Sequence, residues 1–152
     1  MKIFIFDIDD TIYVHDKKLD YNNIKEDNIL INFLYYCPYP KYVYTNATYG
    51  HADEILKKMK ISNNFIKIYS RDNIPSMKPD INSAIALEND ISLKYNEQNQ
   101  YYFFDDLLEN LKSVKKRGWI TIWISPLFNT KGNFPFIDFA FPDIKTALSS
   151  LR

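Results

Sequence analysis

The chain has 152 residues, equal numbers of basic and acidic side chains, and 16% aromatic residues. This length suits one domain with a single core, and the balanced charge gives no global field that would recruit nucleic acid. The one cysteine excludes an internal disulfide, and no apolar run approaches the roughly 18 residues that span a bilayer. Without a secretory leader, we expect a cytoplasmic, intracellular protein with no membrane role and a single domain over residues 1–152.

Apolar, β-type runs alternate along the chain with segments that repeat apolar residues near i, i+3 and i+4. The runs predict strands and the segments between them predict helices. In chain order we expect strand 3–6, helix 22–36, strand 42–44, helix 52–60, strand 66–69, helix 80–94, strand 101–104, helix 107–117 and strand 120–124. Gly118 suits a helix end, and Pro142 suits the first turn of a last helix that ends near Leu151. The alternation predicts an α/β fold: a three-layer, doubly wound (Rossmann-like), mainly parallel sheet of about five to six strands.

The first predicted strand ends in the carboxylates of Asp7 and Asp9. Two acids one residue apart raise each other's pKa and are costly to bury, unless a cation relieves the repulsion. The carboxyl ends of strands are also where ligands bind to open parallel sheets. These residues therefore predict a functional site; the alternative is a pair of solvated acids where the strand meets a loop.

Three more predicted segments place polar groups on the same edge. Thr45 and Asn46 follow the second strand, where a hydroxyl and backbone N–H groups can hold a phosphate oxygen or simply cap a helix. Lys78 directly precedes a proline that can open a helix; alone, it would be a solvated surface lysine. Asp105 and Asp106 repeat the pattern of a strand followed by two acids, and alone they could be acids at a helix amino terminus. Together these positions predict one shared site.

In this order, Asp7-Ile8-Asp9-Asp10-Thr11, Thr45, Lys78 and Asp105-Asp106 resemble the four motifs of the haloacid dehalogenase-like (HAD) superfamily of aspartate-nucleophile phosphotransferases. The resemblance implies that Asp7 attacks phosphorus to form an aspartyl-phosphate. It also implies that Asp9 protonates the leaving group and then activates water. A carboxylate suits this role, since its phosphoryl adduct is reactive and divides one hydrolysis into two displacements.

The resemblance further implies a Mg²⁺ cofactor, held by the carboxylates of Asp7 and Asp105 and the backbone carbonyl of Asp9. Asp106 would be another ligand or an orienting group. Mg²⁺ prefers octahedral oxygen coordination by a few carboxylates, water and substrate phosphate, so the residue types agree. The phosphate-binding residues would be Asp7 itself together with Thr45, Lys78 and Asn46.

Residues 4–13, 43–47 and 103–106 look most like the pyrimidine 5′-nucleotidase branch of the superfamily, whose members carry a helical cap between the first two motifs. Residues 12–44 leave too little chain for a cap, since units below roughly 40 residues seldom fold alone. We therefore expect one HAD-like catalytic domain with no separate cap domain, or a minimal one, and an open site. Its substrate would be a phosphorylated small molecule such as a nucleotide, or the phosphorylated end of a macromolecule, and a homodimer could cover the site.

Two other classes remain open. A receiver-like phospho-acceptor domain also gathers acids, a threonine and a lysine on such an edge, but places its acceptor after the third strand, where this chain has Ser70-Arg71-Asp72. It also has no analogue of Asp9. The third class is a HAD scaffold that binds without turnover.

Four aromatic and imidazole side chains are expected near the mouth of the site, as base or leaving-group contacts or as ordinary exposed residues: Tyr13, His15, Tyr49 and His51. No second His or Cys stands at metal-binding spacing from His51, so we do not expect it to be a ligand. The cations of residues 112–117 predict a solvated helix face, with a nucleic-acid patch as the alternative.

Overall fold

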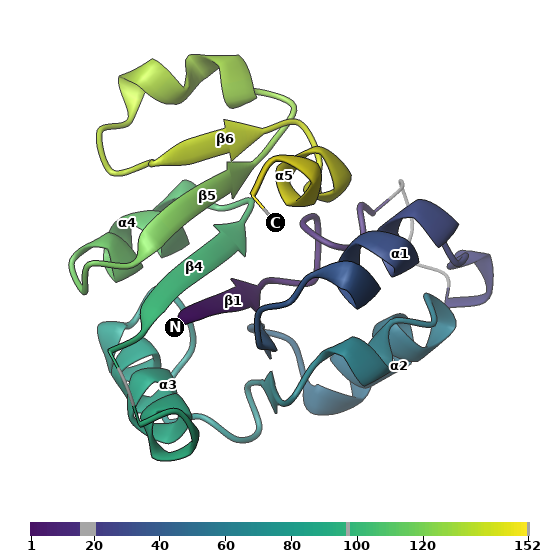
Figure 1. The fold of residues 1–152 in the computed structure, drawn as a ribbon, viewed down its shortest axis with the longest axis horizontal. Helices are drawn as coiled ribbons and strands as arrows, with labels where there is room; N and C mark the ends of the chain where they lie inside the picture. The colour runs from purple at the N-terminus through teal and green to yellow at the C-terminus, as the bar shows by residue number, and fades with distance from the viewer. Residues whose placement is uncertain (16–20, 97, 152) are drawn as a thin grey trace.

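The computed structural model describes residues 1–15, 21–96 and 98–151. They form a six-stranded, all-parallel sheet in the order β3-β2-β1-β4-β5-β6, with helices on both faces (Figure 1). The strands are β1 Lys2–Phe6, β2 Lys41–Tyr44, β3 Ile68–Tyr69, β4 Gln100–Asp105, β5 Ile120–Ile124 and β6 Phe139–Phe141. The helices are α1 Asn28–Tyr36, α2 Tyr49–Lys58, α3 Ile81–Lys94, α4 Leu108–Lys115 and α5 Ile144–Leu151, with 3-10 turns at Tyr21–Asn23, Ser62–Asn64 and Phe128–Asn133. The predicted three-layer, doubly wound fold is confirmed.

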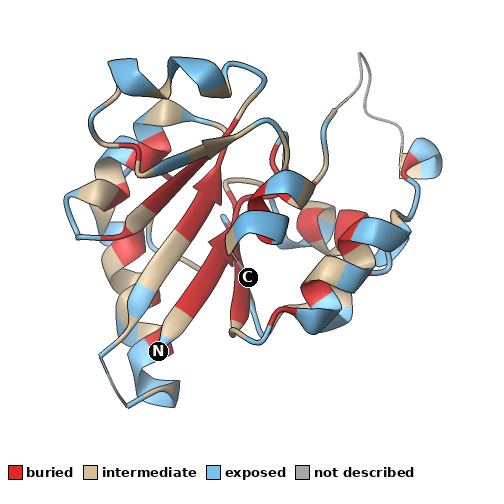
Figure 2. Ribbon diagram, turned by 45° about the horizontal axis from the view of Figure 1, so that its top comes forward, coloured by how far each residue is buried: buried red, intermediate tan, exposed pale blue. Residues whose placement is uncertain are grey.

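Alternation along β1 assigns its side chains to two cores. Phe4 and Phe6 pack with buried residues of α1, α2 and α5, whereas Ile3 and Ile5 pack with those of α3 and α4. Successive side chains of a strand point to opposite faces, and a parallel sheet covered on both faces is apolar throughout. Figure 2 shows the buried residues concentrated on the central strands. The polar residues that follow these strands are therefore held at the rim of a rigid layer.

Several element boundaries differ from the sequence predictions. The helix expected over 22–36 begins at Asn28, because the Asp27 carboxylate accepts hydrogen bonds from the backbone N–H groups of Ile29 and Leu30 and so caps the helix. Pro142 does not open α5: Asp143 accepts from the N–H of Thr146 and caps it instead. Gly118 ends α4 with a positive φ of 80°, as predicted.

Two strands also differ. β3 is only Ile68–Tyr69, shorter than the 66–69 expected, and β6, at Phe139–Phe141, was not among the predicted runs. β6 lies at the edge of the sheet and Phe139 is exposed, so its apolar pattern carries little signal. Between β1 and β2, the described residues form only the first 3-10 turn and α1.

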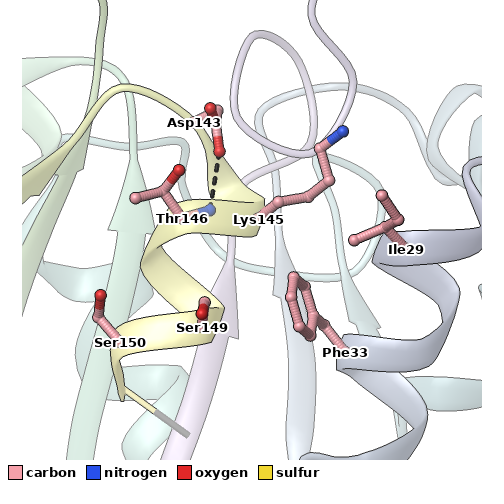
Figure 3. A pocket seen from close by; sticks show the side chains of 7 residues that line it. All are labelled: Ile29, Phe33, Asp143, Lys145, Thr146, Ser149 and Ser150. Atoms are coloured by element: carbon pink, nitrogen blue, oxygen red, sulfur yellow. Dashed lines mark hydrogen bonds between the residues drawn. The ribbon is translucent and has the colours of Figure 1, made fainter.

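A cavity of about 370 Å³ lies between α1 and α5 (Figure 3). An ion pair 2.9 Å long joins Lys145, in the first turn of α5, to Asp27, the residue that caps α1. It therefore links the amino-terminal ends of the two helices that flank this cavity. None of the predicted site residues lines it. In the part of the chain that the structure describes, no helix is both long and apolar enough to cross a membrane.

Candidate active site

The acids at the ends of β1 and β4 meet because these strands are neighbours. Phe6 pairs with Phe104, and the backbone N–H of Asp7 donates to the Phe104 carbonyl at 2.9 Å. Asp7 and Asp105 thus follow in register on adjacent strands. Both are buried, with exposed fractions of 7% and 0%.

Lys78 enters this site from the loop before α3. Its ammonium donates to Asp7 Oδ1 at 3.0 Å, to Asp105 Oδ2 at 2.9 Å and to the Tyr44 carbonyl at 2.9 Å. Burial disfavours its charge, but Asp105 and Asp7 outweigh burial and raise the pKa of Lys78 above its usual value. Lys78 is therefore not the surface lysine that its local sequence alone would suggest.

This geometry fills all three donors of the ammonium. A direct contact between Lys78 and a phosphoryl oxygen requires exchange of one of the three bonds. In the arrangement described, the positive charge acts first on Asp7 and Asp105.

The Asp7 carboxylate is held on both oxygens. Oδ1 accepts from Lys78, and Oδ2 accepts from the Thr11 hydroxyl at 2.9 Å. Burial and the charge of Asp105 raise the pKa of Asp7 well above its ordinary value, and Lys78 acts in the opposite direction. Thr11 is fully buried, and the sequence alone does not predict that this residue of the first motif orients Asp7.

Asp105 and Asp106 have different surroundings. Asp105 accepts from the Leu107 N–H at 2.8 Å and from the Asn110 side chain at 3.1 Å, in addition to Lys78. Asp106 accepts a long hydrogen bond from the Thr11 hydroxyl at 3.5 Å, and burial followed by the charge of Asp105 raises the pKa of Asp106 to about 6. α4 begins only at Leu108, so neither acid lies within its first turn. Asn110 was not predicted: it lies five residues after Asp105, a separation with no helical periodicity.

The donor set suits a hard divalent cation. Asp7, Asp105 and Asp106 each place one carboxylate oxygen within 4.8 Å of the others. The ligands are all oxygens, and two of the three carboxylates, those of Asp7 and Asp105, share the Lys78 ammonium. Mg²⁺ favours oxygen ligands supplemented by water, and its charge would oppose the burial and the repulsion from Asp105 that raise the pKa of Asp7. These residues therefore fit Mg²⁺.

Thr45 and Asn46 follow β2 on the same rim. The Thr45 hydroxyl accepts from the Ala47 N–H at 3.1 Å, which leaves its hydrogen for another acceptor. Asn46 binds the backbone of residue 78 twice, with its amide donating to the Lys78 carbonyl and accepting from the Lys78 N–H. Neither residue caps α2, because Thr48 does so. Asn46 thus positions Lys78, which its sequence position did not indicate.

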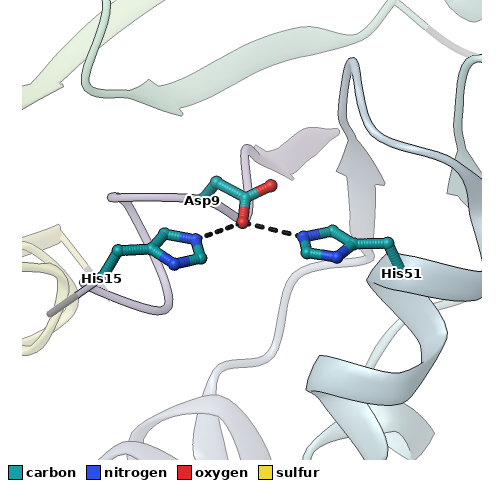
Figure 4. A group of neighbouring side chains, drawn as sticks. All are labelled: Asp9, His15 and His51. Carbon is teal, nitrogen blue, oxygen red and sulfur yellow. Dashed lines mark hydrogen bonds and ion pairs between the residues drawn. The ribbon is translucent and has the colours of Figure 1, made fainter. Parts of the chain in front are cut away.

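Asp9 points to a different set of partners (Figure 4). His15 Nε2 lies 2.5 Å and His51 Nε2 lies 2.9 Å from the same oxygen, Asp9 Oδ1. Tyr21 Oη lies 2.6 Å from Nδ1 of His51. No second His or Cys stands at metal-binding spacing from His51 along the chain, but the fold brings the other histidine and a carboxylate beside it.

The candidate site opens into a cavity of about 220 Å³. Its lining comes from all four motifs: Asp7, Asp9, Asp10, Thr45, Asn46, Ala47, Lys78, Asp106, Leu107 and Asn110. A second cavity, of about 420 Å³, shares Asp10 and Asp106 with the first and is otherwise lined mainly by apolar residues, including Val14, Ile124 and Pro126. The fold therefore places a small polar cavity beside a larger apolar one.

No protein-family model matches the chain, and no curated protein matches it in sequence. Its fold, however, is that of HAD-like hydrolases. The magnesium-bound HAD-hydrolase YfnB from Bacillus subtilis has a TM-score of 0.66 at 16% identity, over 82% of this chain and 54% of that one. L-2-haloacid dehalogenase from Xanthobacter autotrophicus has a TM-score of 0.66 at 14% identity, over 87% of this chain and 63% of that one. The chain thus spans less than two thirds of these two proteins.

A third structure is similar over nearly its whole length. D,D-heptose 1,7-bisphosphate phosphatase from B. bronchiseptica, complexed with magnesium and phosphate, has a TM-score of 0.66 at 15% identity, over 99% of this chain and 98% of that one. The HAD-like core expected from the four motifs is therefore confirmed as the fold. At these identities the likeness is one of fold.

Proposed function

We propose that the protein is a Mg²⁺-dependent phosphomonoester hydrolase that works through an aspartyl-phosphate on Asp7. One observation carries the proposal: the buried Asp7 carboxylate is fixed by Lys78 and Thr11 beside two further acids, at the rim of a polar cavity. A phosphatase that binds magnesium and phosphate shares the fold along 98% of its length. This likeness supports the proposal without identifying the substrate.

In the proposed reaction, an Asp7 carboxylate oxygen attacks phosphorus and the bond to the leaving oxygen breaks. Lys78 and Thr11 hold the carboxylate in one orientation, and Thr45 can donate its hydroxyl hydrogen to a phosphoryl oxygen. Positive charge fixed beside the developing negative charge supplies most of the catalysis in phosphoryl transfer. Mg²⁺, held by Asp7, Asp105 and Asp106 with the backbone carbonyl of Asp9, would supply further positive charge.

Asp9 would act first as an acid toward the leaving oxygen and then as a base toward water. Its side chain is 33% exposed and lines the same cavity as Asp7, so it can exchange protons with solvent and with a bound substrate. Water then attacks the phosphorus of the aspartyl-phosphate and restores the Asp7 carboxylate.

For the substrate, we propose a phosphorylated small molecule of the nucleotide type. The larger cavity beside the site has apolar walls from Val14, Ile124 and Pro126, which suit a ring on the leaving group. The phosphorylated end of a protein or polynucleotide is the second candidate, because only one 3-10 turn and α1 are described between β1 and β2.

The strand order argues against a receiver-like switch. Receivers of the flavodoxin-like type have the order 2-1-3-4-5, whereas this sheet has β3-β2-β1-β4-β5-β6. Asp72 follows edge strand β3 and accepts a hydrogen bond from the Tyr49 N–H, outside the acid cluster. These features support an enzyme that hydrolyses its substrate repeatedly, rather than a phospho-acceptor switch.

The experiment is an assay of phosphate release with and without Mg²⁺, using 4-nitrophenyl phosphate, nucleoside 5′-monophosphates, a phosphopeptide and phosphorylated oligonucleotides. Chloride release from 2-chloropropionate is the parallel test for dehalogenation. Asp7→Asn is expected to lower turnover by at least about 10³-fold. Asp53→Asn, a matched change at a partly exposed residue of α2 outside the acid cluster, is expected to leave turnover unchanged.

Asp9→Asn separates the two chemical steps. 4-Nitrophenolate needs no proton to leave, so this variant is expected to release about one equivalent in a burst and then stall as the aspartyl-phosphate. Full turnover by Asp7→Asn, or steady turnover by Asp9→Asn at the wild-type rate, contradicts the proposed mechanism.

A further inference from the structure

The two histidines of the chain, His15 and His51, converge on one carboxylate oxygen. His15 follows β1 in the loop after the first motif, and His51 lies in the first turn of α2, so they come from separate elements. Figure 4 shows both rings directed at Asp9 from opposite sides. The chain has only two histidines, and each places its Nε2 atom beside Asp9. Asp9 is the residue on which the proposed acid–base chemistry depends.

The surrounding structure holds this arrangement in place. Asp10 has a left-handed φ of 63°, and its carboxylate accepts from the His15 N–H at 3.0 Å, so it fixes the turn that returns His15 toward Asp9. On the other side, Tyr21 Oη lies 2.6 Å from His51 Nδ1. A histidine that binds a metal through Nε2 usually donates its Nδ1–H to such a second partner, which fixes the tautomer.

From this geometry we propose that His15, His51 and Asp9 form a second cation site, selective for a borderline metal such as Zn²⁺, whose occupation inhibits the enzyme. Two imidazoles and one carboxylate suit Zn²⁺ and its neighbours, whereas Mg²⁺ prefers the all-oxygen cluster of the first site. Metal binding by these three residues does not depend on the enzyme's activity. Inhibition by the bound metal rests on the proposed phosphatase function.

Only small movements are needed to admit the ion. Bond lengths of about 2.0–2.2 Å around a tetrahedral Zn²⁺ separate its ligand atoms by about 3.4 Å. The distances from Asp9 Oδ1 to the two Nε2 atoms are now 2.5 and 2.9 Å, and the three side chains remain 18–33% exposed. Three protein ligands leave a fourth position for water.

Inhibition follows from the identity of the shared ligand. A metal bound to Asp9 Oδ1 removes that oxygen from proton transfer to the leaving group or from water. The first site, with Asp7, Asp105 and Asp106, shares no side chain with the second. Both cations can therefore bind together, and Zn²⁺ acts without displacing Mg²⁺.

The test is a Zn²⁺ titration of the whole protein in excess Mg²⁺, followed by NMR of the imidazole C–H resonances, of which the chain has two sets. The single cysteine, Cys37, is buried, so it does not compete for the ion. We expect both histidines to shift together and to saturate at one Zn²⁺ per chain. Tyr21→Phe is expected to weaken binding about 10-fold, and His51→Gln more than that.

Glu54→Gln, an exposed change on the same helix as His51, is the matched control and is expected to retain wild-type affinity. If the imidazole resonances do not respond to Zn²⁺, or if His15 responds equally well in His51→Gln, there is no shared site and the proposal is overturned. Far-UV circular dichroism checks that each variant is folded.

The activity arm uses phosphate release in excess Mg²⁺. Zn²⁺ is expected to inhibit the wild type and Glu54→Gln at the concentration that saturates the NMR signal, and to require at least about 10-fold more in His51→Gln. Equal inhibition of all three proteins overturns the inhibitory role. If no substrate is turned over, the proposed function has failed, and the NMR titration still decides the metal site.

Discussion

Lys78 is the side chain on which the charge balance of the site depends. Its ammonium is almost completely buried and is bonded to two carboxylates, and it opposes the effects of burial and of Asp105 on the pKa of Asp7. A buried charge that loses its partner is far more costly than an ion pair on the surface.

Lys78→Met removes this charge and keeps a side chain of similar length. At pH 7 we expect the free energy of unfolding to fall by about 3–5 kcal/mol, because two buried carboxylates lose their cation. Without Lys78 the folded-state pKa of Asp7 rises further above its unfolded value, so the variant regains stability as the pH falls. Urea unfolding at pH 7 and pH 5 measures both effects.

The control for this variant is Lys57→Met, at a lysine on α2 whose side chain is 66% exposed. It is expected to change stability little at either pH. Equal stability of the two variants at pH 7 would show that the Lys78 ammonium is not needed to compensate the buried carboxylates of Asp7 and Asp105.

Asp106 gives a pH-dependent prediction. Its pKa is raised to about 6 in the folded protein, chiefly by burial and then by Asp105. The folded state therefore holds this proton more readily than the unfolded state does. The resulting stability is fully present below about pH 4 and is lost as the pH rises through about 6.

Asp106→Asn removes this titration. In EDTA, the variant is expected to be more stable than the wild type at pH 8, and the difference is expected to shrink as the pH falls toward 4. Urea unfolding across this range measures it. A difference that is constant with pH would mean that Asp106 titrates equally in both states.

At the scale of secondary structure, apolar periodicity predicted the buried faces of the helices but not their ends. α1 begins at Asn28 and α5 at Ile144 because Asp27 and Asp143 bind the free N–H groups of the first turn. Several polar residues near each boundary could serve as such a cap. β6 was missed for another reason: a three-residue edge strand with an exposed Phe139 has no distinctive pattern.

Two glycines in the helical layers predict opposite effects of the same substitution. Gly118 ends α4 at φ 80°, where a side chain is strained although the space is open. Gly118→Ala is expected to lower the free energy of unfolding by about 1–2 kcal/mol. Gly50 lies within α2, also with open space, so Gly50→Ala is expected to raise it by about 0.4–1 kcal/mol.

Chemical denaturation of both variants beside the wild type measures the pair. Since neither added methyl group meets another atom within 4 Å, packing does not confuse the comparison. Destabilisation by both substitutions would indicate that backbone conformation at residue 118 is not the cause.

At the scale of the whole molecule, the sequence predicted which strand ends meet. The order of acids, threonine and lysine on a parallel sheet was enough to place Asp7, Lys78, Asp105 and Asp106 at one edge. His15 and His51 were expected near the mouth of the site, but their convergence on Asp9 was not, since it depends on the path of a loop and the angle of α2. The sequence also did not predict that Lys78 is buried with all three N–H donors of its ammonium bonded. This placement depends on the two hydrogen bonds between the Asn46 side chain and the backbone of Lys78.

Mg²⁺ should act on the stability of the entire domain. A cation that binds only the folded state adds about 2.7 kcal/mol at a concentration 100 times its Kd. We therefore expect the Tm of the wild type to rise with Mg²⁺ concentration, and the rise to be largely lost in Asp105→Asn. Thermal unfolding with and without EDTA measures the effect.

Asp53→Asn is the control and should respond to Mg²⁺ like the wild type, because Asp53 lies on α2 outside the acid cluster. A Tm that rises equally in Asp105→Asn would place the bound cation elsewhere.

The central place of β1 also bears on how the protein is made. Lys2 pairs with Gln100 and Phe6 with Phe104, so one edge of this apolar strand has no partner until β4 has left the ribosome. An unpaired edge is a template for aggregation, and pairing between segments so far apart in the chain is slow. Covering of the open edge of β1 and arrival of Asp105 beside Asp7 are then a single event in biosynthesis, and β5 and β6 add to the sheet afterwards. The acids of the candidate site therefore come together only when the open edge of β1 is covered.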